Sequence, residues 1–133
     1  MYSEIVGILS SGSLKKKSIY ESSKKKYILA AALAGFFIGI GTLIMSLSNM
    51  IFKDLSFPVV KFSNGLAFSI ALSLVMAIGG ELFTGNVLVL SMGGLNKKLK
   101  SSEVFKICTL SYFGNLIGAI FISLLFLGAE SFR

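Results

Sequence analysis

Three long apolar blocks separated by short polar stretches dominate the pattern of hydrophobic and polar positions along this chain. Charged residues are absent from positions 27–52 and 107–129, and Glu81 is the single charge within positions 62–96. A helix needs about 20 apolar residues to cross the hydrocarbon core of a bilayer. The pattern therefore predicts an all-α membrane protein with three transmembrane helices, at about residues 27–52, 62–92 and 107–129.

The second block is too long for one straight span. A helix over residues 65–92 would measure roughly 42 Å, about 12 Å more than the bilayer core. Its middle combines chain-breaking glycines, a carboxylate and two capping side chains, which are Gly79, Gly80, Glu81, Thr84, Gly85 and Asn86. These residues favour a helix broken near residues 79–86.

A break at membrane depth has a functional meaning. Irregular backbone survives there only where it is buried in protein or lines a wet cavity, so the break indicates a path or a binding site. In the alternative interpretation, Gly79 and Gly80 form a tight turn that merely ends one helix near the membrane surface.

A helix that restarts between Thr84 and Val87 would point its free amides and its positive dipole end toward the membrane centre. Such helix ends attract anions. Thr84 can cap this helix while its hydroxyl still donates to an ion, and Asn86 can be the cap if the boundary shifts. Both assignments remain open from the sequence.

Glu81 needs a separate explanation, because an ionised acid at the centre of a spanning helix costs roughly 2.5–3.5 kcal/mol and would repel an anion. We expect its carboxylate to turn away from the path and to accept hydrogen bonds from the amides of the loop, which would hold the broken segment in shape. The alternative role is a proton relay, for which these spans offer no second titratable partner.

Two further patterns concern packing. Phe68 and Leu72 lie four residues apart on one helical face, which fits either a hydrophobic constriction in a pore or ordinary contact with a neighbouring helix. Small residues allow close helix contact in the first and third spans, at Gly35, Gly39, Gly114 and Gly118. Asn115 stands between the last two glycines and predicts an interhelical hydrogen bond.

Composition supports the membrane assignment, with 54% hydrophobic residues, 14% charged residues and a net charge of +7. The lysines flank the apolar blocks and are not interleaved with aromatic residues, so they indicate topology and not nucleic-acid binding. Ten of the 13 basic residues fall before the first block or between the second and third, and three, with Arg133 among them, fall on the other side. The positive-inside rule then predicts a multi-pass protein of the inner (plasma) membrane, with a cytoplasmic N-terminus and an outward C-terminus.

The chain contains no histidine and a single cysteine, Cys108. This composition excludes a Ser/His catalytic pair, a multi-ligand metal site and an intrachain disulfide. No nucleophile and base pair can be assembled, so we expect neither an enzyme nor a cofactor. Residues 1–26 form a polar N-terminal segment before the three-span unit of residues 27–133, and this segment is either a short helix lying on an anionic membrane surface or a disordered tail.

Three motifs resemble those of the formate/nitrite transporter family. Residues 80–86 (GELFTGN) resemble its signature loop, residues 31–41 (AALAGFFIGIG) its first-helix motif, and residues 112–119 (YFGNLIGA) a motif of its third helix. The motifs occur in the family's order and spacing, and the resemblance covers about residues 25–130.

The resemblance implies a homopentameric, aquaporin-like channel for a small monovalent anion such as formate, nitrite or hydrosulfide, with one pore in each protomer. The family's second helix is interrupted by an Ω-shaped loop whose three characteristic residues correspond to Leu82, Phe83 and Thr84. Family gate residues fall on Phe68 and Leu72, which favours the pore interpretation for both. Phe68 with Leu82 would narrow the outer side and Leu72 with Phe83 the inner side, leaving Thr84 at a chamber between them.

Family members have two inverted three-span repeats, and this chain matches the first. The central histidine and the lysine of the second repeat, which are thought to attract the anion and supply a proton, are absent. We therefore expect a half-length channel chain, either truncated or completed by a separately encoded second repeat. The alternative is a non-transporting truncated protein or an assembly partner of a pentameric channel. A small dual-topology cation-coupled exporter fits poorly, because the span count is odd and the charge bias is strong.

Overall fold

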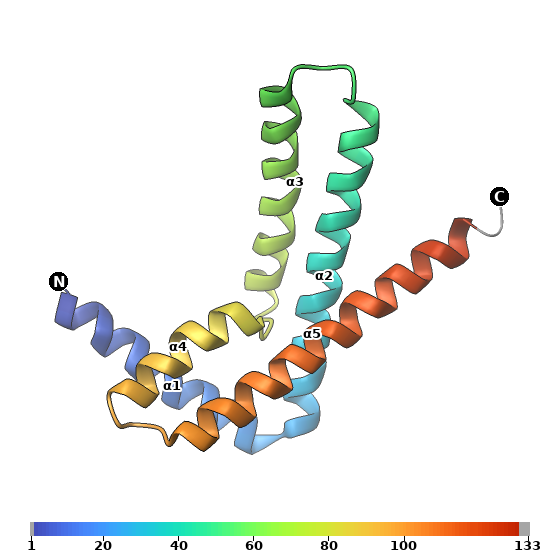
Figure 1. Cartoon of the computed structure of the whole chain (residues 1–133). Coiled ribbons are helices and arrows are strands. Elements are labelled where there is room, and N and C mark those ends of the chain that lie inside the picture. The colour runs from blue at the N-terminus through green and yellow to red at the C-terminus, as the bar shows by residue number, and fades with distance from the viewer. Residues whose placement is uncertain (1, 131–133) are drawn as a thin grey trace.

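The structure is a computed structural model, and it describes residues 2–130. Arg133, which entered the charge count, lies outside the described residues. The regular structure within 2–130 consists of helices (Figure 1), which are α1 (Tyr2–Ser22), α2 (Lys24–Ile51), α3 (Phe57–Ala77), α4 (Phe83–Leu95) and α5 (Ser101–Glu130).

Three of these helices, α2, α3 and α5, are long and apolar enough to cross a membrane, and α4 is a shorter apolar helix. The second apolar block forms both α3 and α4, because the chain leaves helical geometry between Ala77 and Phe83. Pro58 lies in the first turn of α3, where its missing N–H interrupts no helical hydrogen bond.

Within the polar N-terminal segment, Tyr2–Ser22 form a helix of 21 residues, which agrees with the helical and not the disordered interpretation of that part. Ser23 separates α1 from α2 and caps α2 by accepting a hydrogen bond from the Lys26 amide. Helix α1 packs mainly on α4. The contact is close because small residues meet there: a side chain at Gly93 would overlap Ser13, and both Ser13 and Ser10 are buried.

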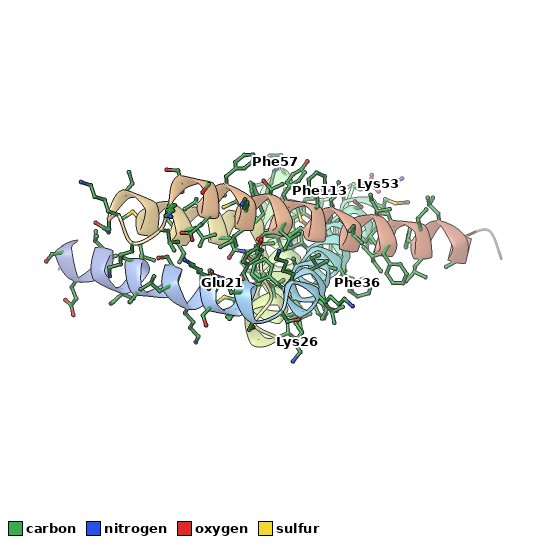
Figure 2. The ribbon with its side chains drawn as sticks, turned by 90° about the horizontal axis from the view of Figure 1, so that it is seen from below. Glu21, Lys26, Phe36, Lys53, Phe57 and Phe113 are labelled. Atoms are coloured by element: carbon green, nitrogen blue, oxygen red, sulfur yellow. The ribbon has the colours of Figure 1, made fainter. Side chains whose placement is uncertain are left out.

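The helices form an open arrangement around α2. Helices α2 and α3 form an antiparallel hairpin, α5 crosses α2, and α4 continues from the break toward α1 (Figure 1). Seen along the hairpin, α1 extends to one side of it, while α5 crosses it and extends to both sides (Figure 2). A compact core lies where α2, α4 and α5 meet, and it consists of Tyr27, Leu90, Leu99, Ile107 and Cys108.

The outer faces of the helices carry many exposed apolar side chains. Met76 is 81% exposed on α3, and Leu124 is 60% exposed on α5. Figure 2 shows side chains projecting outward along the whole length of α5. A single chain therefore leaves most of its apolar surface for contact with lipid or with further protein.

Candidate functional site

The break between α3 and α4 is built on two glycines with different roles. Gly79 adopts a left-handed conformation, with φ +66°, and its amide bonds the carbonyl of Met76 at 3.1 Å. Residues with a Cβ rarely adopt this conformation. Gly80 donates to the carbonyl of Val75 at 2.8 Å, and a Cβ there would lie 3.1 Å from the Ala34 side chain. The break therefore presses against α2.

Helix α4 begins at Phe83, with Leu82 as the N-cap residue and no side-chain cap. Both predicted caps, Thr84 and Asn86, are therefore wrong. Gly85 and Asn86 lie inside α4, so the break is shorter than the predicted range 79–86. The cap is supplied from another helix instead, because the Phe83 amide donates to Oδ1 of Asn115 on α5 at 2.8 Å.

Asn115 joins three separate segments through its side-chain amide. Its Nδ2 donates to the carbonyl of Ala31 on α2 at 2.8 Å and to the carbonyl of Glu81 at 3.0 Å, while its Oδ1 accepts from Phe83. The predicted interhelical hydrogen bond therefore exists, and it extends to the break itself. The Glu81 amide adds a bond of 3.3 Å to the carbonyl of Ala30.

The Glu81 carboxylate binds Lys16 of α1, with 2.7 Å between Oε2 and Nζ. The prediction that it would accept hydrogen bonds from the amides of the loop is wrong in this respect. The Glu81 side chain is 7% exposed and the Lys16 side chain 24% exposed, so water screens this pair only partly. The polar N-terminal segment thus supplies the counter-charge that the spans lack. Sequence reasoning missed Lys16, because its distance of 65 residues from Glu81 leaves no local signal.

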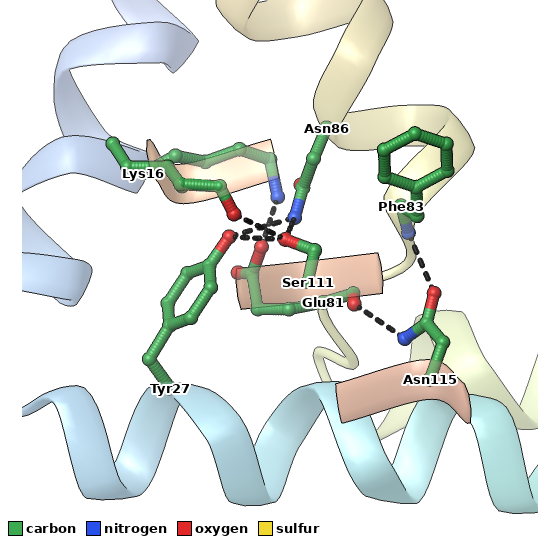
Figure 3. A network of polar contacts seen from close by, with 8 residues as sticks. Lys16, Tyr27, Glu81, Phe83, Asn86, Ser111 and Asn115 are labelled. Carbon is green, nitrogen blue, oxygen red and sulfur yellow. Dashed lines mark hydrogen bonds and ion pairs between the residues drawn. The ribbon is translucent and has the colours of Figure 1, made fainter. Parts of the chain in front are cut away.

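A fully buried polar network lies beside this pair (Figure 3). Nδ2 of Asn86 is 2.7 Å from both the Tyr27 hydroxyl and the Ser111 hydroxyl, and these two hydroxyls are 2.9 Å apart. Oδ1 of Asn86 has no hydrogen-bond partner within residues 2–130. The network ties α4 to α2 and α5. Ser111 precedes Asn115 by four residues, so helical spacing is the signal that could have identified it.

Glycines set the distance between α2 and α5. A Cβ at Gly35 would overlap the backbone of Asn115, and a Cβ at Gly118 would overlap the backbone of Ala32. At Gly39 and Gly114 the added atom would collide with side chains of the opposite helix. These four glycines thus act as the packing faces that the sequence predicted, and they bring Asn115 within reach of α2.

Two cavities flank the break. The larger, of about 740 Å³, lies between α1, α3 and α4, and Lys16, Leu72, Glu81, Leu82 and Thr84 are among the residues that line it. The smaller, of about 290 Å³, lies between α2, α4 and α5 and is lined by Leu82, Phe83 and Thr84 together with Gly35 and Asn115.

The predicted pore residues are distributed unevenly over these cavities. Leu72, Leu82 and Thr84 share the larger one, whereas Phe83 faces the smaller one and packs edge-on against Tyr112, with 5.5 Å between ring centroids. Phe68 lies near Gly41 of α2. The structure therefore places Leu72 with Leu82, where the resemblance paired Phe68 with Leu82 and Leu72 with Phe83.

A second ion pair fixes α1 to the start of α5. Nζ of Lys17 lies 2.7 Å from Oε1 of Glu103 and 3.7 Å from Oε1 of Glu21. The hydrogen bond that Lys17 donates to the Glu103 carboxylate raises the pKa of Lys17 above its ordinary value of 10.5, so this lysine stays charged at physiological pH. Lys16 thus attaches α1 to the break between α3 and α4, and Lys17 attaches it to the start of α5.

The sequence model of the formate/nitrite transporter family matches residues 4–133, nearly the whole chain. The chain belongs to the formate/nitrite transporter family. The chain is 36% identical over 112 residues to the uncharacterized transporter YwcJ of Bacillus subtilis, covering 84% of this chain and 44% of that protein. It is 34% identical to the nitrite transporter NirC of Salmonella typhimurium over 74% of this chain and 35% of that protein.

The fold agrees with this family. A solved structure described as an FNT family ion channel superimposes with a TM-score of 0.82 at 26% identity, covering 96% of this chain and 50% of that one. The chain spans less than half the length of the curated relatives named above. The family and the three apolar helices identify a multi-pass membrane protein.

Proposed function

We propose that this chain forms one half of a transmembrane channel for small monovalent anions of the formate, nitrite or hydrosulfide type. The path would run through the larger cavity, beside the break between α3 and α4. The observation that carries this proposal is the N-terminus of α4, which opens into a cavity lined by lysines.

The electrostatics of this cavity favour an anion. No acceptor within residues 2–130 satisfies the amides of Thr84 and Gly85 at the first turn of α4, and both residues line the cavity. The Thr84 hydroxyl also makes no hydrogen bond within that part of the chain, so it remains available as a donor. Lys15 and Lys16 line the same cavity, and Glu81 is already neutralised by Lys16. Free amides, a helix dipole and an excess of positive charge together attract a negative solute.

Apolar side chains would provide selectivity. Leu72 is 37% exposed and lines the cavity with Leu82, so these two leucines would narrow the path next to Thr84. Phe68 and Phe83 would add the further constrictions that the family resemblance implies. Apolar constrictions admit a small protonated acid at lower free-energy cost than its anion, which is why the anion would cross together with a proton.

Thr84 and Met76 line the larger cavity and are exposed in this chain. A second three-helix unit would cover them and form the opposite wall of the path. We further propose that the complete units assemble as pentamers with an aquaporin-like fold. The lysine distribution supports insertion in the inner membrane with the N-terminus in the cytoplasm.

Anion flux into liposomes tests the proposal. The chain is reconstituted alone and also together with the second three-span half of a full-length family member, and formate, nitrite or hydrosulfide is added outside vesicles that contain a pH-sensitive dye. We expect flux from the combined halves. Flux from neither preparation would remove the channel function and leave the fold unaffected. Crosslinked pentamers without flux would favour the non-transporting assembly partner.

A pair of threonine variants tests the site. Thr84→Val keeps the side-chain shape but removes the hydroxyl from the cavity, and we expect about tenfold slower flux, the effect of one lost hydrogen bond to a charged group. Thr42→Val is the matched control, since the Thr42 hydroxyl bonds only the Ile38 carbonyl of its own helix and lines neither cavity beside the break. Equal flux in the two variants would show that Thr84 does not contact the ion.

A further inference from the structure

A basic pocket lies at the connection between α4 and α5, away from the break. It has a volume of about 680 Å³, and its lining includes Lys17, Lys97, Lys98 and Lys100. Glu103 also lines it, but its carboxylate is occupied by the Lys17 ammonium at 2.7 Å and the Lys100 amide at 2.9 Å. No ion pair within residues 2–130 engages the ammonium groups of Lys97, Lys98 and Lys100. The pocket therefore carries three uncompensated positive charges.

The loop that holds these lysines is fixed in place. The amides of Lys98 and Leu99 both donate to the carbonyl of Gly93, at 2.9 and 3.2 Å, and Lys97 adopts a left-handed conformation that closes the end of α4. Leu99 is 5% exposed and belongs to the hydrophobic core. The lysines are consequently presented by an anchored turn and not by a freely moving tail.

An apolar groove starts where the basic pocket ends. A cavity of about 540 Å³ between α4 and α5 shares Gly94 and Ser101 with the basic pocket, and Leu95 and Phe105 form its apolar walls. A third cavity, of about 260 Å³, continues along the same helices and shares Phe105 and Cys108 with the second. Leu95 is 78% exposed and Phe105 is 72% exposed, so these walls have no partner in the described chain.

We infer that this surface binds one anionic phospholipid, with its phosphate headgroup at Lys97, Lys98 and Lys100 and an acyl chain along the groove between α4 and α5. The geometry matches the molecule in two ways. The positive charge lies at one end, next to the first turn of the membrane-spanning helix α5, and the uncharged groove leads from there along that helix. A small soluble phosphate would use the pocket but not the groove. Basic pockets between transmembrane helices are suited to lipid headgroups.

Retention of lipid in detergent provides the test. The full chain is purified from membranes, exposed to equal amounts of phosphatidylglycerol and phosphatidylcholine at physiological salt, and analysed by native mass spectrometry. We expect one phosphatidylglycerol per chain and little phosphatidylcholine. The triple variant Lys97→Gln, Lys98→Gln, Lys100→Gln should bind phosphatidylglycerol about a hundredfold more weakly, because each lysine near an anionic headgroup contributes a several-fold factor.

The matched control removes the same charge elsewhere. Lys24→Gln, Lys25→Gln, Lys26→Gln changes three exposed lysines at the start of α2, outside the groove, and should retain the lipid. Phe105→Ala should weaken retention several-fold, whereas Phe62→Ala, with a 71% exposed ring on α3, should not. Circular dichroism verifies that the variants keep their helicity.

Four outcomes would overturn the inference. Equal losses in the two lysine variants would indicate only general attraction to a charged surface. Equal retention of both lipids would exclude headgroup recognition. Displacement of the lipid by millimolar glycerol phosphate would indicate a site for small soluble anions. Oligomers that carry no lipid and crosslink through position 105 would show that a neighbouring chain occupies the groove.

Discussion

Asn115→Ala offers the sharpest test of how this chain stabilises its break. The side-chain amide makes three hydrogen bonds, to the Ala31 carbonyl, the Glu81 carbonyl and the Phe83 amide. Hydrogen bonds between side chains in membrane proteins contribute about 0.6 kcal/mol on average, and buried groups left unpaired cost more, about 1–3 kcal/mol. Removal of all three bonds should therefore lower the free energy of unfolding by about 2–3 kcal/mol.

Asn49→Ala is the matched control, since the same atoms are deleted but one bond is lost, the one from Nδ2 of Asn64 at 2.8 Å. Its expected cost is about 0.6 kcal/mol. Reversible unfolding of the full chain in mixed micelles, titrated with a denaturing detergent and followed by circular dichroism, measures both variants. A cost for Asn115→Ala no larger than that for Asn49→Ala would refute the view that Asn115 holds the start of α4 in place.

Four further predictions concern packing, backbone conformation and charge. Gly118→Ala should destabilise the contact between α2 and α5 by about 3 kcal/mol in the same titration, because the added methyl group would overlap the backbone of α2. Gly128→Ala is its control: the methyl group there would meet no other atom, and alanine should stabilise α5 by about 0.5–1 kcal/mol. Gly79→Ala should lower the free energy of unfolding by about 1–2 kcal/mol, since the φ of +66° at this position strains any residue with a Cβ. A variant as stable as the parent chain would contradict this prediction. Lys16→Met should lower the free energy of unfolding by about 2 kcal/mol, which is less than the loss expected when a fully buried ion pair is broken. Faster hydrogen exchange of the amides throughout α1 would reveal this loss. Glu81→Gln should keep α1 packed in place, because glutamine can still accept a hydrogen bond from Lys16, whereas Glu81→Leu should release α1. Equal rates of amide hydrogen exchange in α1 of the two variants would exclude a structural role for this side chain.

Local patterns accounted for much of the fold. The absence of charge over residues 27–52 and 107–129 predicted two helices that the structure contains as α2 and α5, although α5 begins earlier, at Ser101. Excess length and clustered glycines predicted an interruption of the second block, and the helix ends at Ala77. These features depend on residues close together in the chain, so the sequence carries them directly.

Contacts between segments that lie far apart in the sequence were not predicted by local patterns. Capping side chains near residue 84 suggested a local cap, but the amide of Phe83 is satisfied by Asn115 because α5 crosses α2 at a glycine contact. The counter-charge for Glu81 likewise came from α1, which sequence reasoning treated as a surface element or a tail.

The sequence by itself determined that the chain is apolar enough to cross a membrane three times and that its second apolar block is interrupted near Gly79, because hydropathy and glycine content act over a few neighbouring residues. Tertiary structure alone decided which side chains satisfy the polar groups at that break. A buried amide or carboxylate takes whichever partner the packing of α1, α2 and α5 brings within about 3 Å, and no local pattern encodes that choice.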